Sequence, residues 1–193
     1  MSVSVLGISG SMRYPSETGE AVEVALRGAE RAGAHTQYLD LSRIELPFCD
    51  GRSDEDSYPE SVQAFRGLIR SAHGIILGTP EYHNSMTGAL KNALDLCSGA
   101  DFEHKMVGLI GVAGGAISAV NAINHLRIVM RSVGAWVVPH QVSIANTDAA
   151  LRRINEETDS PMHERLLKLG GDVAKFSKLI VAGIIDVSGM EEV

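Results

Sequence analysis

Strand-like and helix-like patterns alternate along the chain. Short segments rich in apolar and β-branched residues, typical of strands, lie at 3–8, 35–41, 74–79, 105–115 and 136–139. Segments with apolar residues at helical spacing follow them at 16–33, 62–72, 86–97, 117–135 and from residue 160 onward. Residues 43–61 form a long polar loop. Because helices connect consecutive strands, the pattern predicts a parallel sheet with helices on both faces.

Several helical segments have recognisable ends and apolar faces. The first is expected to stop at Gly33, and the last to begin after Asp159 or Ser160 as N-cap, with Pro161 in the first helical position. The residues expected on buried faces are Ala21, Val24, Ala25 and Leu26 in the first helix, Met86, Leu90, Ala93, Leu94 and Cys97 in 86–97, and Leu166, Leu169, Val173, Phe176 and Ile180 in the last.

The number of strands limits which α/β fold the chain can form. About five strands in 193 residues match the smaller doubly wound folds, so we expect a three-layer α/β/α sandwich with strand order 2-1-3-4-5. Residues 1–193 show no repeat or linker and are expected to form one domain. Ligands of such sheets bind outside the carboxyl ends of the strands, where the strand order reverses. The loops after strands 1, 3 and 4 are therefore the place to look for function.

Composition and charge remove several classes of protein. A net charge of −7 argues against a nucleic-acid-binding protein, which normally has a basic face. No apolar stretch approaches the ~20 residues that span a bilayer, and the N-terminus has no basic leader before an apolar core. The two cysteines, Cys49 and Cys97, imply no disulfide framework. We therefore expect a cytoplasmic protein with no nucleic-acid or membrane partner.

The first loop, within "GISGSMRYPS" (7–16), combines small hydroxyl residues with one cation. It lies between a strand and a helix, where free backbone N–H groups and the positive end of the helix dipole favour an anion. Arg13 adds a guanidinium that suits a phosphate dianion, and hydroxyl donors come from Ser9, Ser11, Ser16 and Thr18. The alternative is that the serines only cap the helix and that Arg13 is a solvated surface residue.

Two nucleotide motifs are absent from this loop. No lysine follows the glycines as a P-loop requires, and Gly7 and Gly10 have no third glycine in the register of a dinucleotide fingerprint. A phosphate loop without a catalytic lysine indicates a mononucleotide that is held rather than hydrolysed.

The other two loops have compositions that suit a flat ring. After strand 3, Pro80 stiffens the turn, and Tyr82, His83 and Asn84 offer an aromatic plane and hydrogen-bond donors. Glu81 in the same loop fits an ion pair as well as a ligand contact. After strand 4, Gly114 and Gly115 let the backbone approach a ligand closely, although a tight turn into the next helix explains them equally well.

Other candidate chemistry is weaker. The seven histidines show no metal-ligand spacing, and no C-x-x-C motif is present. The acidic run 54–56 is interpreted as a solvated loop rather than a metal site, and Cys97 as a core residue. We expect no metal.

The chain resembles the NAD(P)H-dependent FMN reductases of flavodoxin-like fold. "GSMRYPS" (10–16) is similar to their G-S-x-R-x-x-S phosphate loop, and "TPEYHNSMTGALKNALD" (79–95) to T-P-E-Y-x-x-S-x-x-G-x-L-K-N-x-x-D. The second segment is long and specific, and the resemblance covers roughly residues 3 to 140.

The resemblance implies how FMN would be bound. Phosphate contacts would come from Ser11, Arg13, Ser16 and Thr18, and isoalloxazine contacts from Pro80, Glu81, Tyr82, His83, Asn84, Gly114 and Gly115. No catalytic side chain is implied, because the flavin carries the chemistry. The family usually forms dimers or tetramers with the helix after "PEY" at the interface, so a homodimer or homotetramer is expected.

Two functions from different classes follow from these observations. The first is an enzyme that takes hydride from NADPH or NADH and passes electrons to a flavin, quinone, azo compound or metal oxyanion by a ping-pong route. The second is a flavodoxin-like electron carrier that binds FMN but does not oxidise NAD(P)H itself. The segment at 79–95 favours the enzyme, whereas a protein that FMN does not turn yellow would be neither.

Overall fold

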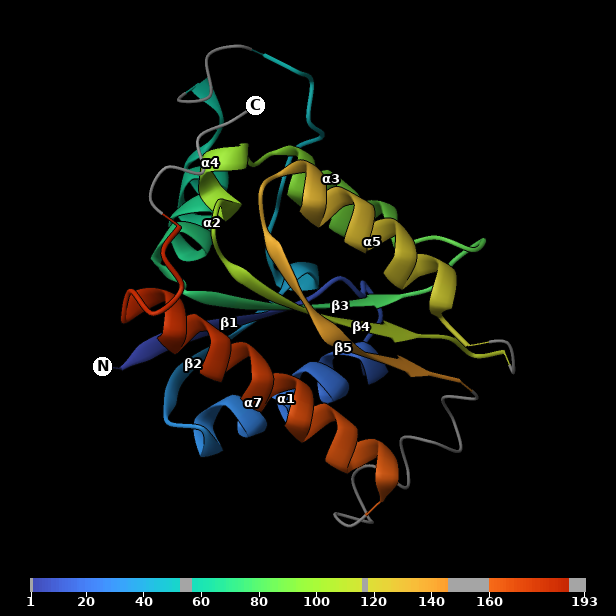
Figure 1. Cartoon of the computed structure of the whole chain (residues 1–193). Helices are drawn as coiled ribbons and strands as arrows, with labels where there is room; N and C mark the ends of the chain where they lie inside the picture. The colour runs from blue at the N-terminus through green and yellow to red at the C-terminus, as the bar shows by residue number, and fades with distance from the viewer. Residues whose placement is uncertain (1, 53–56, 116–117, 146–159, 188–193) are drawn as a thin grey trace.

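Five parallel strands form one sheet in the order β2-β1-β3-β4-β5 (Figure 1). The computed structural model describes residues 2–52, 57–115, 118–145 and 160–187. The strands are β1 (Val3–Ser9), β2 (Ala34–Asp40), β3 (Gly74–Pro80), β4 (Met106–Val112) and β5 (Trp136–Ile144). The predicted sheet and its strand order are therefore confirmed. The acidic run 54–56 and the alternative N-cap Asp159 lie outside the described residues.

Helices cover both faces of this sheet in the predicted three layers. On one face lie α1 (Glu17–Arg31) and α7 (Pro161–Val181), and on the other α2 (Glu60–Ser71), α3 (Gly88–Asp95) and α5 (Val120–Ser132) (Figure 1). The short elements η1 (Leu41–Arg43) and α4 (Gly99–Phe102) were not predicted. Four residues do not complete two helical turns, so α4 leaves no readable periodicity in the sequence.

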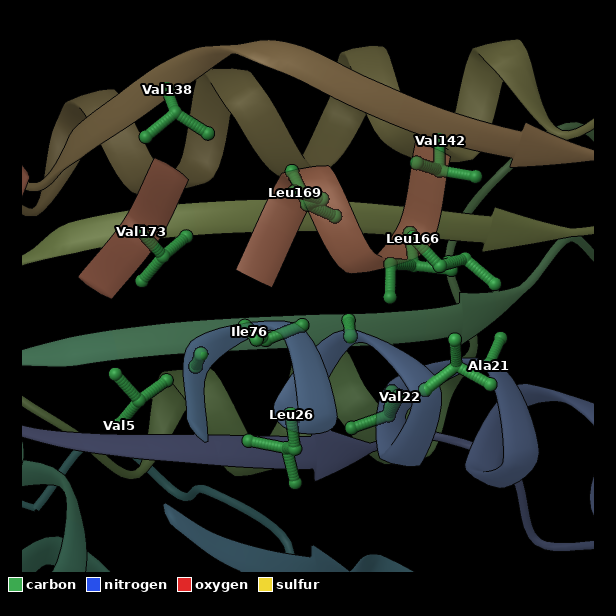
Figure 2. Packing of buried hydrophobic residues seen from close by; sticks show 14 of the residues in the cluster. Val5, Ala21, Val22, Leu26, Ile76, Val138, Val142, Leu166, Leu169 and Val173 are labelled. Carbon is green, nitrogen blue, oxygen red and sulfur yellow. The ribbon is translucent and has the colours of Figure 1, made fainter. Parts of the chain in front are cut away.

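The strands are apolar on both sides because each side has its own core. Val5 of β1 and Ile76 of β3 pack with α1 and α7, as Figure 2 shows. Their neighbours Leu6 and Ile75 point to the opposite face and pack with α2, α3 and α5. Successive residues of a strand alternate between faces, so a strand covered twice reads as a continuous apolar run. This explains why 74–78 has no polar side chain.

The edge strand β5 is longer than predicted. The sequence pattern ended this strand at Pro139, but β5 continues to Ile144. Its pairing with β4 is irregular here, since Val107 pairs with Val137 whereas Leu109 pairs with Gln141. A proline without an N–H is tolerated at such an irregularity on an edge strand. The expectation that Pro139 ends the strand was therefore wrong.

Three helices begin at side chains that cap their free amides. Ser16 accepts a hydrogen bond from the Gly19 N–H, Thr87 from the Leu90 N–H, and Ser160 from the His163 N–H. Ser160, followed by Pro161, confirms the predicted start of the last helix. The helix expected over 86–97 begins later, at Gly88, because Thr87 acts as its N-cap.

Glycines allow α1 and α7 to cross with their backbones in contact. A Cβ placed on Gly170 would overlap the carbonyl oxygen of Ala25, and one on Gly28 would overlap the backbone of Leu167. Leu166, Leu169 and Val173 of α7 are fully buried, as their spacing predicted. Phe176 departs from that prediction because its side chain is 37% exposed.

A buried ion pair fastens α4 to α2. Asp101 and Arg66 are almost fully buried and lie 2.9 Å apart, and Arg70 also binds the Asp101 carboxylate. Burial alone would raise the pKa of Asp101, but hydrogen bonds from the Ser98 amide and from the two arginines outweigh it, so the pKa lies below its usual value. The carboxylate therefore stays charged at neutral pH, although it is buried.

Candidate functional site

Three loops meet at the carboxyl edge of the sheet and line a small open hollow of about 70 Å³. They follow β1 (residues 10–16, the first loop), β3 (81–87, the third loop) and β4 (113–115, the fourth loop). The hollow is lined by Ser11, Arg13, Pro15, Glu17, Thr18, Pro80, Glu81, Tyr82, Val112 and Gly114. Its volume is below the roughly 300–1,000 Å³ typical of small-molecule sites, so a ligand as large as a nucleotide would extend beyond the hollow. The loops chosen from the strand order are thus brought together.

The first loop presents hydrogen-bond donors to this hollow. Helix α1 begins at Glu17, so the N–H groups of Glu17 and Thr18 belong to its first turn, where no preceding carbonyl can accept them. Ser11 and Thr18 are almost completely buried in the protein and line the hollow. Within the described residues, Arg13 forms no ion pair with a carboxylate. The donors and the positive charge together suit a phosphate dianion.

Ser16 has a different position from the other predicted phosphate residues. Its hydroxyl accepts the Gly19 N–H at 3.0 Å, and its side chain does not line the hollow. For this residue, the helix-cap alternative describes the structure. The cap still contributes to the site, because it fixes the helix end from which the Glu17 and Thr18 amides extend.

The third loop contains a tight turn that separates its predicted ring contacts into two groups. Pro80, Glu81 and Tyr82 line the hollow. His83 and Asn84 are exposed, do not line it, and have positive φ angles of 51° and 62°. Reciprocal backbone hydrogen bonds between Tyr82 and Ser85 close the turn around them. In this structure His83 and Asn84 are turn residues.

Glu81 is bonded to a helix rather than to a basic side chain. Its Oε2 accepts a hydrogen bond of 2.9 Å from the Ala122 N–H in the first turn of α5, and its own N–H donates to the Val112 carbonyl. No ion pair of Glu81 is found in the part of the chain that the structure describes. At least one oxygen of the Glu81 carboxylate therefore binds the protein backbone and not only a ligand.

The glycines of the fourth loop lie in a bend at the mouth of the hollow. Gly114 lines the hollow and Gly115 is exposed beside it. Neither has a positive φ, and a Cβ on either would meet no described atom within 4 Å. Neither glycine is therefore required by a left-handed backbone or by close packing against the described residues, and both the turn and the ligand-approach interpretations remain. An open backbone at the mouth of the hollow is what a flat ligand needs.

Three lining residues were not predicted as site residues: Pro15, Glu17 and Val112. Pro15 and Glu17 flank the predicted Ser16, so their place in the loop sequence was the available signal. Val112 ends β4 and was interpreted only as part of a buried strand. Its position two residues before the glycine pair could have indicated it.

The fold is that of a doubly wound α/β protein. Where its strand order reverses, the first loop, which suits a phosphate, lies beside the third loop, which suits a flat ring. The donor set fits a flavin mononucleotide, since the amides, hydroxyls and Arg13 match its phosphate and the open wall at Tyr82 and Gly114 matches its ring. The chain belongs to the NADPH-dependent FMN reductase family, whose model matches residues 3–149.

Known relatives agree with this membership. The FMN-dependent NADPH-azoreductase of Staphylococcus saprophyticus is 42% identical over 145 residues, covering 73% of this chain and 76% of the relative. The NAD(P)H-dependent FAD/FMN reductase of Geobacillus thermodenitrificans is 34% identical over 173 residues, covering 89% and 91%. Among solved structures, apo NADH:FMN oxidoreductase (EMOB) has a TM-score of 0.71 at 22% identity and covers 91% of this chain and 89% of that one, which supports the flavodoxin-like fold.

Proposed function

We propose that this protein binds FMN in the hollow at the carboxyl edge and uses it to oxidise NADPH or NADH with a small-molecule electron acceptor. A flavin, a quinone, an azo compound or a metal oxyanion would serve as that acceptor. The supporting observation is that one hollow is lined both by residues that suit a phosphate, such as Arg13, and by residues that suit a flat ring, such as Tyr82. An azoreductase among the relatives favours an aromatic azo compound as the first acceptor to try.

The roles of the residues follow from their positions. Ser11, Thr18, Arg13 and the amides of Glu17 and Thr18 would hold the phosphate, and Pro80, Tyr82 and Gly114 would lie beside the ring. When bound, FMN would carry out the chemistry of hydride and electron transfer. The protein contributes binding and orientation, and Tyr82, which lines the hollow and is 47% exposed, would be accessible to a second ligand. The described part of the chain contains no helix able to cross a bilayer.

A face shared by both substrates predicts that they bind in turn. If the nicotinamide and the acceptor both use the face beside Tyr82, the nucleotide must leave before the acceptor enters. Double-reciprocal plots of NADPH oxidation at several azo-dye concentrations, recorded with FMN-saturated protein and no partner protein, should be parallel. Lines that intersect would show that both substrates bind at once and would reject the shared face.

We also propose that the protein forms a homodimer or homotetramer through the layer that contains α3 and α5 (Figure 1). On α5, Ile128 is 66% exposed and Val120 is 44% exposed, although both are apolar. Light scattering should give a multiple of 20.6 kDa, and Ile128→Glu should shift the mass toward one chain. A 20.6 kDa particle for the FMN-saturated wild type at micromolar concentration would contradict this proposal.

A further inference from the structure

Helix α5 begins without a cap of its own. The residue in the N-cap position is Ala119, whose methyl group cannot accept a hydrogen bond. The first amides of a helix have no partner within the helix, so such a start depends on acceptors from elsewhere. Ser143 of β5 supplies one, because its Oγ accepts the Ala119 N–H at 2.9 Å.

Glu81 supplies the second acceptor from a distant part of the chain. Its Oε2 accepts the Ala122 N–H at 2.9 Å across 41 positions of sequence. Ala122 is buried and lies in the first turn of the helix. A carboxylate is also the favoured charge at this end of a helix, where the dipole is positive. The contact is therefore a cap that the site loop provides for α5.

A second contact joins the same two elements. Ser85, at the end of the third-loop turn, lies 2.9 Å from the Nδ1 of His125. His125 follows Ala122 by three positions, so the two residues share one side of α5. Glu81 and Ser85 thus bind the helix from both ends of the turn that includes Tyr82.

We propose that Glu81 is a positioning residue: its carboxylate ties the third loop to the start of α5, and so sets the wall against which the flavin ring lies. The inference rests on the proposed binding of FMN. Because α5 follows the fourth loop, the same hydrogen bond fixes the spacing between the Tyr82 wall and the Gly114 wall of the hollow. His125 supports the far end of the turn.

The test separates the ring end from the phosphate end. In Glu81→Ala, the dissociation constants of FMN and riboflavin should rise together, by roughly five- to tenfold as expected for loss of a helix cap. Their ratio should stay that of the wild type, because the phosphate donors are untouched. In the protein without FMN, the Ala122 amide should lose protection from hydrogen exchange. Glu81→Gln, which keeps an acceptor oxygen, should restore most of both properties.

Two further variants control the experiment. Asn124→Ala removes an exposed side chain from the same helix and should leave both ligand affinities unchanged. His125→Ala, also at an exposed position, should lower the affinity for both ligands, as Glu81→Ala does. It still tests the proposal if Glu81→Ala does not fold.

The proposal is overturned if the Ala122 amide keeps its protection in Glu81→Ala, if the FMN-to-riboflavin ratio changes, or if Glu81→Gln behaves like Glu81→Ala. A wild type that binds no FMN, while Ala122 still loses protection in Glu81→Ala, would instead refute the proposed function and leave the helix cap intact.

Discussion

Gly170→Ala is expected to destabilise the protein by about 3 kcal/mol or more, at the upper end of overpacking substitutions in a close-packed core. The added Cβ would overlap the carbonyl oxygen of Ala25 in α1, and a helix backbone cannot rotate aside as a side chain can. The helices would have to separate and loosen the layer formed by Leu169 and Val173. For a chain of this size the melting temperature should fall by roughly 6–12 °C in calorimetry.

The neighbouring glycine provides a matched control. A Cβ on Gly171 would lie 3.6 Å from the Gly28 carbonyl oxygen, which is ordinary contact. Alanine is favoured over glycine inside a helix by about 1 kcal/mol, so Gly171→Ala should melt at or above the wild-type temperature. If Gly170→Ala melted with the wild type, α1 and α7 would not cross in the way described.

Arg13→Ala should weaken FMN binding by about tenfold or more, since a hydrogen bond to a charged group contributes roughly 1.5–3 kcal/mol. Arg13 lines the hollow and, within the described residues, pairs with no carboxylate, so its charge is available to a phosphate dianion. Riboflavin has no phosphate, and its affinity should change far less. Fluorescence titration of both ligands measures the difference.

A second arginine controls for net charge. Arg27 lies on the exposed side of α1, well beyond its first turn, and Arg27→Ala removes the same charge from the protein. It should leave the affinities for FMN and riboflavin unchanged. An equal loss of both ligands in Arg13→Ala would mean that this residue supports the fold and does not contact the phosphate.

The sheet could be predicted because its physical cause is local. A strand covered on both faces must be apolar throughout, and 74–78 has that property. The loops could also be chosen, since the strand order determines which of them meet. By contrast, the end of β5 was misplaced because the tolerance for Pro139 depends on an edge position that only the assembled sheet creates.

The separate roles of the site residues were less predictable. Whether Ser16 contacts a ligand or caps a helix depends on a rotamer, and the sequence favours both. The bond from Glu81 to Ala122 spans 41 positions and uses a backbone amide, which has no signature in residue type. His83 and Asn84 were grouped with their neighbours, although the positive φ angles of both place them in a turn.

FMN bound in this hollow is expected to accept hydride from NAD(P)H without another protein. The most direct measurement is anaerobic mixing of the FMN-loaded protein with NADPH or NADH while the visible absorption band of the flavin is followed. We predict that the band bleaches with either or both nucleotides and returns when an azo dye or quinone is added. A band that neither nucleotide bleaches until a separate reductase is supplied would contradict this expectation and identify the protein as an electron carrier.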